Sequence, residues 1–217
     1  MNPALISIAQ NPLIISDGLI AYWSFNEEGG NIVRDYSNGS GQNNMTLDGQ
    51  TFVAGTDGSA LKFNGHLLSI PTTVSLNGTM FSLSFWIKTS LLGPNDLLQF
   101  GLGCGAFCIE LGHYYGGTDG GIIFWISCVN QFLNSTIAIN DNNWHHIVAT
   151  VYSGATPSIL YIDGTANCSM SIGPMIATTG GELGWCYNNP AFPDALDEIR
   201  IYNRILSPAE VQILYEN

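Results

Sequence analysis

The fold is decided by residues 196–210, which read LDEIRIYNRILSPAE. The first part of this stretch predicts a β-strand over 195–203. Ser207 then offers a capping hydroxyl, Pro208 takes the first helical position, and Glu210 stands three residues after the cap. These are the signals of a capping box with proline at the helix start. The stretch therefore predicts a strand and then one short C-terminal helix, whose apolar stripe docks on the rest of the domain.

Other segments alternate apolar and polar residues with a period of two, the pattern of a half-buried strand. In FSLSFWIK (81–88) the apolar side chains of Phe81, Leu83, Phe85 and Ile87 share one face, and the alternate residues of 19–25 share a face in the same way. Asp163-Gly164 is a hairpin turn signal directly after ILYI. Further strands are predicted near 61–63, 67–70, 96–101, 106–111, 121–127, 144–152, 158–162 and 181–187. Many short strands separated by turn residues predict a two-sheet sandwich.

Two further stretches complete a pattern with the closing segment. Residues 18–30 read GLIAYWSFNEEGG and residues 34–41 read RDYSNGSG, while WHH stands at 144–146. In order and spacing these segments resemble the laminin-G-like branch of the concanavalin A-like lectin family, over roughly residues 18–217. The resemblance implies an all-β fold: a two-sheet antiparallel jelly-roll sandwich with one short C-terminal helix.

Residues 1–17 lie outside this resemblance and form an N-terminal arm that is too apolar for a solvated tail. We expect the arm to pack on its own domain or to clasp a neighbouring subunit, and the sequence leaves both open. The start lacks the basic region of a secretory signal, and no apolar run is long enough to span a bilayer. We expect no membrane insertion and a place outside the cell or on a virion surface, reached by another route or after removal of a signal.

Composition excludes one class of partner. The chain has 17 acidic and 5 basic residues, a formal net charge of −12, and the basic residues form no patch. Nucleic-acid affinity rests on Lys and Arg, so nucleic-acid binding is not expected. The five cysteines are an odd count that matches no zinc spacing, so at least one thiol is free or pairs between chains. Buried unpaired cysteines are favoured over intrachain bridges.

The resemblance also implies one structural Ca²⁺. In the family, an acidic residue of the first loop and the Asp that opens the penultimate strand commonly share this ion, and these positions match Asp35 and Asp197. Asn38 is a candidate carbonyl donor from the first loop, and Asp57 a candidate side-chain ligand from the third. Such Gly-, Ser- and Asn-rich loops expose the oxygen ligands that calcium takes. The alternative is that Asp35 and Asp197 only cap turns.

Catalysis is not expected. Glycan hydrolysis on this fold needs two carboxylates about 5 Å apart. The nearest approach within one predicted strand is Asp194 and Glu198, four residues and therefore about 13 Å apart. A metal site at residues 144–146 is disfavoured because adjacent strand residues point to opposite faces. The resemblance instead implies a buried Trp144 with one histidine packed or hydrogen-bonded.

Aromatic residues in loops are the candidates for ligand binding. Tyr114 and Tyr115 stand in HYYGG, and Trp185, Tyr187 and Asn188 stand in WCYNNPAF. Flat rings stack on sugars while neighbouring amides bond sugar hydroxyls. The alternative is that these rings fill loop cores or meet another subunit.

Two functional classes follow. The first is a surface-displayed subunit of a larger assembly, such as a virus or phage decoration, fibre or appendage protein, which binds other subunits or its own copies through the arm and can also contact cell-surface glycans. The second is a free-standing calcium-dependent lectin or adhesion protein. A glycan hydrolase ranks below both.

Overall fold

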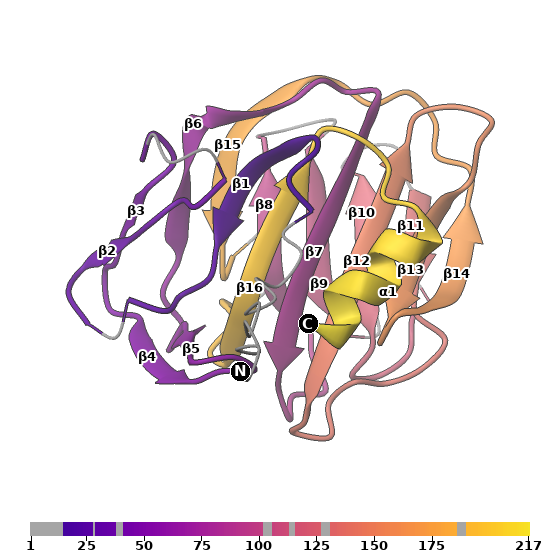
Figure 1. Ribbon diagram of the computed structural model, residues 1–217. Helices are drawn as coiled ribbons and strands as arrows, with labels where there is room; N and C mark the ends of the chain where they lie inside the picture. The colour runs from indigo at the N-terminus through magenta and orange to yellow at the C-terminus, as the bar shows by residue number, and fades with distance from the viewer. Residues whose placement is uncertain are drawn as a thin grey trace, which may run out of the picture.

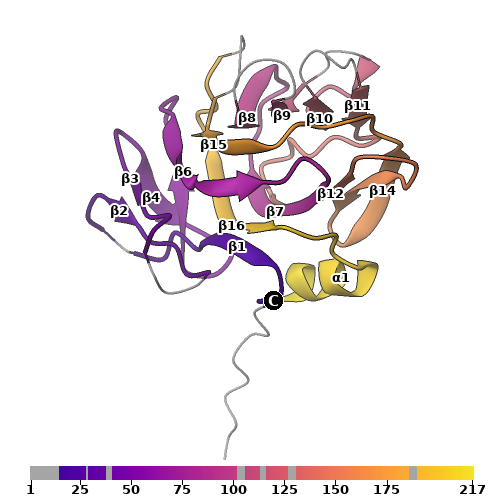
Figure 2. The same cartoon turned by 90° about the horizontal axis from the view of Figure 1, so that it is seen from above.

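The computed structural model describes residues 15–27, 29–37, 41–101, 106–112, 116–126, 131–185 and 190–217. In this part of the chain two antiparallel sheets face each other, and the helix α1 (Pro208–Glu216) lies outside one of them (Figures 1 and 2). The predicted all-β, two-sheet jelly-roll sandwich with one short C-terminal helix is therefore confirmed.

The eight-stranded sheet carries α1 on its outer face (Figure 2). Its strand order is β14 (Thr165–Met170), β13 (Ser158–Ile162), β12 (Trp144–Tyr152), β7 (Met80–Lys88), β16 (Ala195–Tyr202), β5 (Ser59–Lys62) and β4 (Thr51–Ala54). The remaining strand, β1 (Leu19–Trp23), pairs with β16. The two stretches from opposite ends of the sequence therefore lie side by side (Figure 1).

The six-stranded sheet forms the second layer. Its order is β11 (Gln131–Asn134), β10 (Ile122–Ile126), β9 (Phe107–Leu111), β8 (Asn95–Phe100), β15 (Thr178–Leu183) and β6 (Leu68–Leu76). A small two-stranded sheet joins β2 (Ile32–Val33) and β3 (Met45–Thr46).

The predicted hairpin at Asp163-Gly164 is confirmed. Ile162 pairs with Thr165, and Asp163 and Gly164 have φ values of 50° and 74°. Two left-handed residues are the requirement of a type I′ turn. The strand predicted near 181–187 exists with other bounds: β15 begins at Thr178 and ends at Leu183, because Gly184, with a φ of 80°, leaves the extended region. The strands β2, β3, β4, β11 and β14 were not anticipated.

The core lies between the sheets. The predicted inward face of β7 (Phe81, Leu83, Phe85 and Ile87) is at most 3% exposed. The ring of Phe81 stacks on that of Phe107 in the opposite sheet, with centroids 4.5 Å apart. In β1, Ala21 and Trp23 are buried in this core, but a bulge after Leu19 turns Leu19 toward a second cluster.

That second cluster lies beneath α1. Its buried members are Val148, Tyr161, Tyr202, Leu206, Val211 and Leu214. Ser207 caps the helix: its Oγ accepts from the backbone N–H of Glu210, and the Glu210 carboxylate accepts from the N–H of Ser207 at 2.8 Å. The predicted capping box is confirmed, and it fixes α1 on the outer face of the eight-stranded sheet.

The structure bears on three further predictions, which concern the cysteines, the N-terminal arm and membrane-spanning helices. Cys108 is buried and disulfide-bonded, so the preference for unpaired cysteines is wrong at this position. Cys168 is a free thiol, whereas Cys104, Cys128 and Cys186 lie outside the described residues. The same holds for residues 1–14 of the arm. Among the described helices, none is long and apolar enough to cross a membrane.

Candidate ligand-binding site

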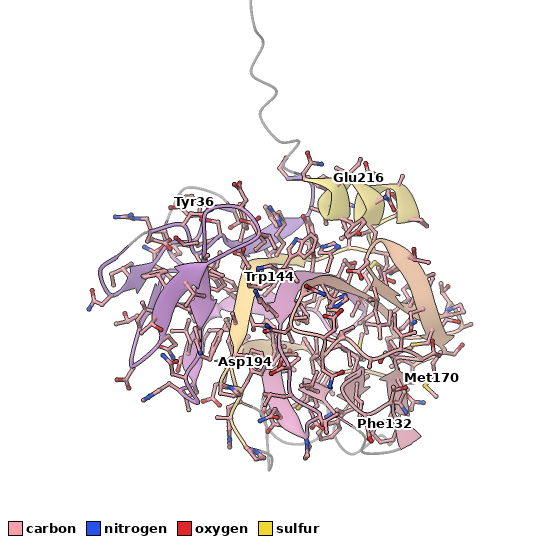
Figure 3. All side chains as sticks on the ribbon, turned by 90° about the horizontal axis from the view of Figure 1, so that it is seen from below. Tyr36, Phe132, Trp144, Met170, Asp194 and Glu216 are labelled. Carbon is pink, nitrogen blue, oxygen red and sulfur yellow. The ribbon has the colours of Figure 1, made fainter. Side chains whose placement is uncertain are left out.

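A pocket of about 510 Å³ opens on the outer face of the eight-stranded sheet, between α1 and the loops that follow β1. Tyr36 borders it from the loop side and Glu216 from α1 (Figure 3). Four aromatic residues line it: Tyr22, Tyr36, Trp86 and Tyr215. The other lining residues are Ser24, Asn26, Thr56, Asp57, Glu198, Arg200, Ile213, Leu214, Glu216 and Asn217. We call this cavity the helix pocket.

Strand β7 places Trp86 in the helix pocket. Since the alternate residues of β7 face the core, Trp86 points outward, toward α1. Its indole stacks on the ring of Tyr215, with centroids 5.8 Å apart and an interplanar angle of 22°, and it lies 5.0 Å from the imidazole of His146. The helix therefore supplies one aromatic wall and the sheet supplies the next.

A bulge in β16 forms the polar wall. The register of β16 against β7 shifts between Asp197 and Arg200, and Glu198 has a φ of 54°. Such bulges redirect side chains at functional sites. The hydroxyl of Tyr22 donates to the Glu198 carboxylate at 2.9 Å, and the Arg200 guanidinium pairs with Glu198 while lying 4.2 Å over the Tyr22 ring. Burial raises the pKa of Tyr22, so its hydroxyl remains a donor.

Three buried polar atoms beside the pocket have no hydrogen-bond partner within the described part of the chain: Asp197 Oδ1, Arg200 Nε and His146 Nδ1. Burial raises the pKa of Asp197 to about 7 and, with the nearby positive charge of Arg200, lowers the pKa of His146 to about 3. Buried polar atoms are nearly always bonded, to protein or to something else. These atoms therefore leave bonding capacity unused beside the helix pocket.

The two aspartates of the predicted calcium site lie in separate hydrogen-bond networks. Asp35 accepts four bonds of 2.8–3.0 Å, from Tyr22 N, Ser37 N, Ser37 Oγ and Asn43 Nδ2. Four bonds fill the acceptor sites of a carboxylate. Asp197 accepts from the N–H and Oγ1 of Thr56 through Oδ2 alone. Among the described residues the two share no partner.

In the part of the chain that the structure describes, one carboxylate oxygen is left free at Asp197 and none at Asp35, and the calcium site stays a prediction. Asp197 Oδ1 is a buried oxygen without a hydrogen-bond partner among the described residues. Asp57 is exposed in the adjoining loop, and Asn38 lies outside the described residues. In the described ranges no group of three or more His, Cys, Asp or Glu is placed to hold a metal ion.

The aromatic residues predicted from the loops are not those of the helix pocket. Tyr114, Tyr115, Tyr187 and Asn188 lie outside the described residues, and Trp185 is half-buried just after β15. The rings of the helix pocket were missed as ligand residues. One signal was present: Trp86 occupies an outward position of the alternating strand 81–88, where a polar side chain is expected.

In the WHH segment (144–146) both histidines are held by hydrogen bonds within the fold. His146 is buried and its Nε2 is 2.9 Å from the hydroxyl of Ser84, while His145 lies between Asp163 and Asp141 at 2.8 and 3.1 Å. The expected burial of Trp144 is wrong. Trp144 is half-buried because it begins β12 at the open end of the sheet, on the outer face.

The two carboxylates considered for catalysis, Asp194 and Glu198, belong to different sites. Asp194 accepts from Thr89 Oγ1, whereas Glu198 belongs to the helix pocket. One carboxylate pair was missed because it spans two strands: Asp96 of β8 is in register with Glu110 of β9. Both are buried, at 0% and 4% exposure, and Trp125 Nε1 donates to Glu110 at 2.6 Å. This pair is therefore shielded from solvent.

Comparison with protein families gives one match. The model described as the concanavalin A-like lectin/glucanases superfamily (Laminin_G_3) matches residues 63–212. No curated protein sequence matches the chain.

Solved structures share the fold. The binding domain of Paraclostridial Mosquitocidal Protein 1 has a TM-score of 0.72 and 20% identity, over 92% of this chain and 52% of that one. Domain 4 of AbnA, an extracellular GH43 arabinanase from Geobacillus stearothermophilus, solved with arabinotriose, has a TM-score of 0.72 and 23% identity, over 91% and 98%. The receptor binding domain of botulinum neurotoxin D has a TM-score of 0.69 and 18% identity, over 93% and 53%. The chain thus spans about half the length of the toxin binding domains.

Proposed function

The chain belongs to the laminin-G-like family of the concanavalin A-like lectin/glucanases superfamily, and from this premise we propose that it is a non-catalytic carbohydrate-binding module. The observation that carries the proposal is the helix pocket, with its four aromatic residues and its convergent polar groups. Rings supply flat apolar faces for a sugar, and amides and carboxylates bond its hydroxyls. The similar structures support this class, because two are toxin binding domains and the third, Domain 4 of AbnA, was solved in complex with arabinotriose.

Two rings can be removed with little risk to the fold. Tyr36 is 46% exposed, and Tyr215 is partly exposed on the surface of α1. A stacking ring contributes about 1 kcal/mol beyond its buried area. Each of Tyr36→Ala and Tyr215→Ala should therefore weaken sugar binding at least about fivefold. Phe132→Ala is the matched control, since it removes a ring from the six-stranded sheet.

Isothermal titration with arabinotriose, followed by a neutral glycan array, tests this proposal. Binding that falls in both tyrosine variants and persists in Phe132→Ala supports the helix pocket. Binding that survives both variants but disappears in Tyr114→Ala or Trp185→Ala would move the site to the loops. Absence of any glycan hit would reject the carbohydrate-binding function.

Calcium is the second part of the proposal. We infer that Asp197 holds a structural Ca²⁺ with oxygens of the neighbouring loop around Asp57, and that the ion neutralises a buried carboxylate. The unpartnered Oδ1 and the burial of Asp197 support this assignment. The ion stabilises the fold and supplies no reaction chemistry.

The third part concerns location and assembly. We propose that the protein acts outside the cell or on a virion surface, as a displayed subunit whose arm binds other subunits or its own copies. The disulfide at Cys108 supports an oxidising location. The contact of Ile15 with the cluster beneath α1 favours an arm that starts from this face. Deleting residues 1–14 and measuring molecular mass by light scattering tests the assembly role: an unchanged mass and unchanged particle attachment reject it.

A further inference from the structure

A second pocket, of about 310 Å³, opens at one end of the eight-stranded sheet and shares no lining residue with the helix pocket. Its lining residues are Val53, Ala54, Lys62, Lys88, Asn142, Trp144, Asp194 and Ala195. Trp144 and Asp194 are labelled in Figure 3. We call it the lysine pocket.

Strand register brings its two lysines together. Ala195 of β16 is the partner of Lys62 on one side and of Lys88 on the other, and Lys88 is in turn the partner of Trp144. Partners across a sheet share a face, so these residues form one row over four strands. The Cα atoms of Lys62 and Lys88 are therefore about 10 Å apart, with the small Ala195 between them. This row leaves room for a group between the two ammonium ends.

The charges of this pocket are unusual for the chain. Of the 5 basic residues, Arg200 and Arg204 form ion pairs with glutamates. The side chains of Lys62 and Lys88 make no hydrogen bond or ion pair within the described ranges. One acidic residue lines the pocket, Asp194, and its Oδ2 accepts from Thr89 Oγ1 at 2.7 Å. Two lysines against one aspartate leave a local positive charge on a protein of net charge −12.

We propose that the lysine pocket binds a sugar carrying a carboxylate, such as a uronic or sialic acid. The carboxylate lies between the ammonium groups of Lys62 and Lys88, the sugar ring contacts the indole of Trp144, and the amide of Asn142 bonds a hydroxyl. A local excess of one positive charge matches one carboxylate better than a doubly charged phosphate. The volume suits a single sugar unit, since it is at the lower end of ligand pockets.

The test is an NMR titration at low ionic strength with D-glucuronate, N-acetylneuraminate, D-glucose and sulfate. We expect an acidic sugar to bind at least tenfold more tightly than glucose. Lys62→Gln and Lys88→Gln should each weaken this binding about tenfold, and added salt should weaken it further. Arg34→Gln is the matched control, because it removes one exposed positive charge elsewhere and should leave binding unchanged.

Three results would overturn the proposal. The first is equal binding of glucose and both acidic sugars, and the second is no effect of the lysine variants. The third is binding of sulfate as tight as that of the acidic sugars, which would mean a simple anion site. Tyr36→Ala and Tyr215→Ala should leave acidic-sugar binding intact. Failure at the helix pocket and failure at the lysine pocket are therefore distinguishable.

Discussion

Acidification should destabilise the fold through His146. This side chain is 1% exposed, and burial, followed by the positive charge of Arg200, lowers its pKa from 6.5 to about 3. Below pH 6.5 the unfolded chain binds a proton that the folded chain does not. The stability supplied by neutral His146 is thus complete above pH 6.5 and is lost as the pH falls toward 3. Each pH unit in this window costs about 1.4 kcal/mol.

The expected loss between pH 7 and pH 4.5 is therefore about 3 kcal/mol from this residue. Urea unfolding of the wild type and of His146→Gln at both pH values measures it. Other groups titrate equally in the two proteins, so the difference between their pH dependences isolates His146. The variant should lose about 3 kcal/mol less than the wild type on acidification.

The neighbouring His145 gives a control of opposite sign. Burial opposes its protonation, but hydrogen bonds to Asp163 and Asp141 outweigh burial and raise its pKa. Its contribution is present below pH 6.5 and is lost as the pH rises through the folded-state pKa. His145→Gln should therefore lose more stability on acidification than the wild type does. Equal pH dependence of the wild type and His146→Gln, or an imidazole of His146 that titrates by NMR above pH 5.5, would refute the reasoning.

Three further outcomes are expected. With calcium at 100 times its Kd, EDTA should lower the melting temperature of the wild type by the equivalent of about 3 kcal/mol. Asp197→Asn should not respond to EDTA. A wild type that melts identically with and without EDTA would refute the calcium site. Phe107→Ala should cost about 3–5 kcal/mol in urea unfolding, since its ring stacks on Phe81, Phe100 and Phe124; a cost below 1 kcal/mol would contradict its place in the core. Ser207→Ala should cost about 1 kcal/mol, and no cost would mean that the cap is not needed.

The fold was predictable because its signals are local. The alternation of residues 81–88 and the capping box at Ser207 each depend on neighbours within a few positions, and both are confirmed. The hairpin at Asp163-Gly164 is of the same kind. Short edge strands such as β11 were missed because four residues carry too little pattern to separate a strand from a loop.

The site was less predictable because tertiary contacts create it. In the helix pocket Tyr22 contacts Glu198, which lies 176 positions later in the sequence. The bulge that places Glu198 there has no local sequence pattern that predicts it. The lysine pocket forms because Ala195 pairs with both Lys62 and Lys88. In the sequence the five basic residues are scattered, so this close pair could not be seen there. Only Trp86, a large ring in a polar position, was visible beforehand.

The helix pocket draws its walls from residues 22–57 and 198–217, with Trp86 between them. A ribosome releases the first of these segments long before the last, so a growing chain can begin to assemble its sheets while the pocket still lacks α1. A fragment that stops before Pro208 would contain nearly all of the main core and none of the aromatic wall made by Tyr215. Ligand capture would then report that α1 has docked on the sheet, and chains without a docked α1 would not bind the ligand.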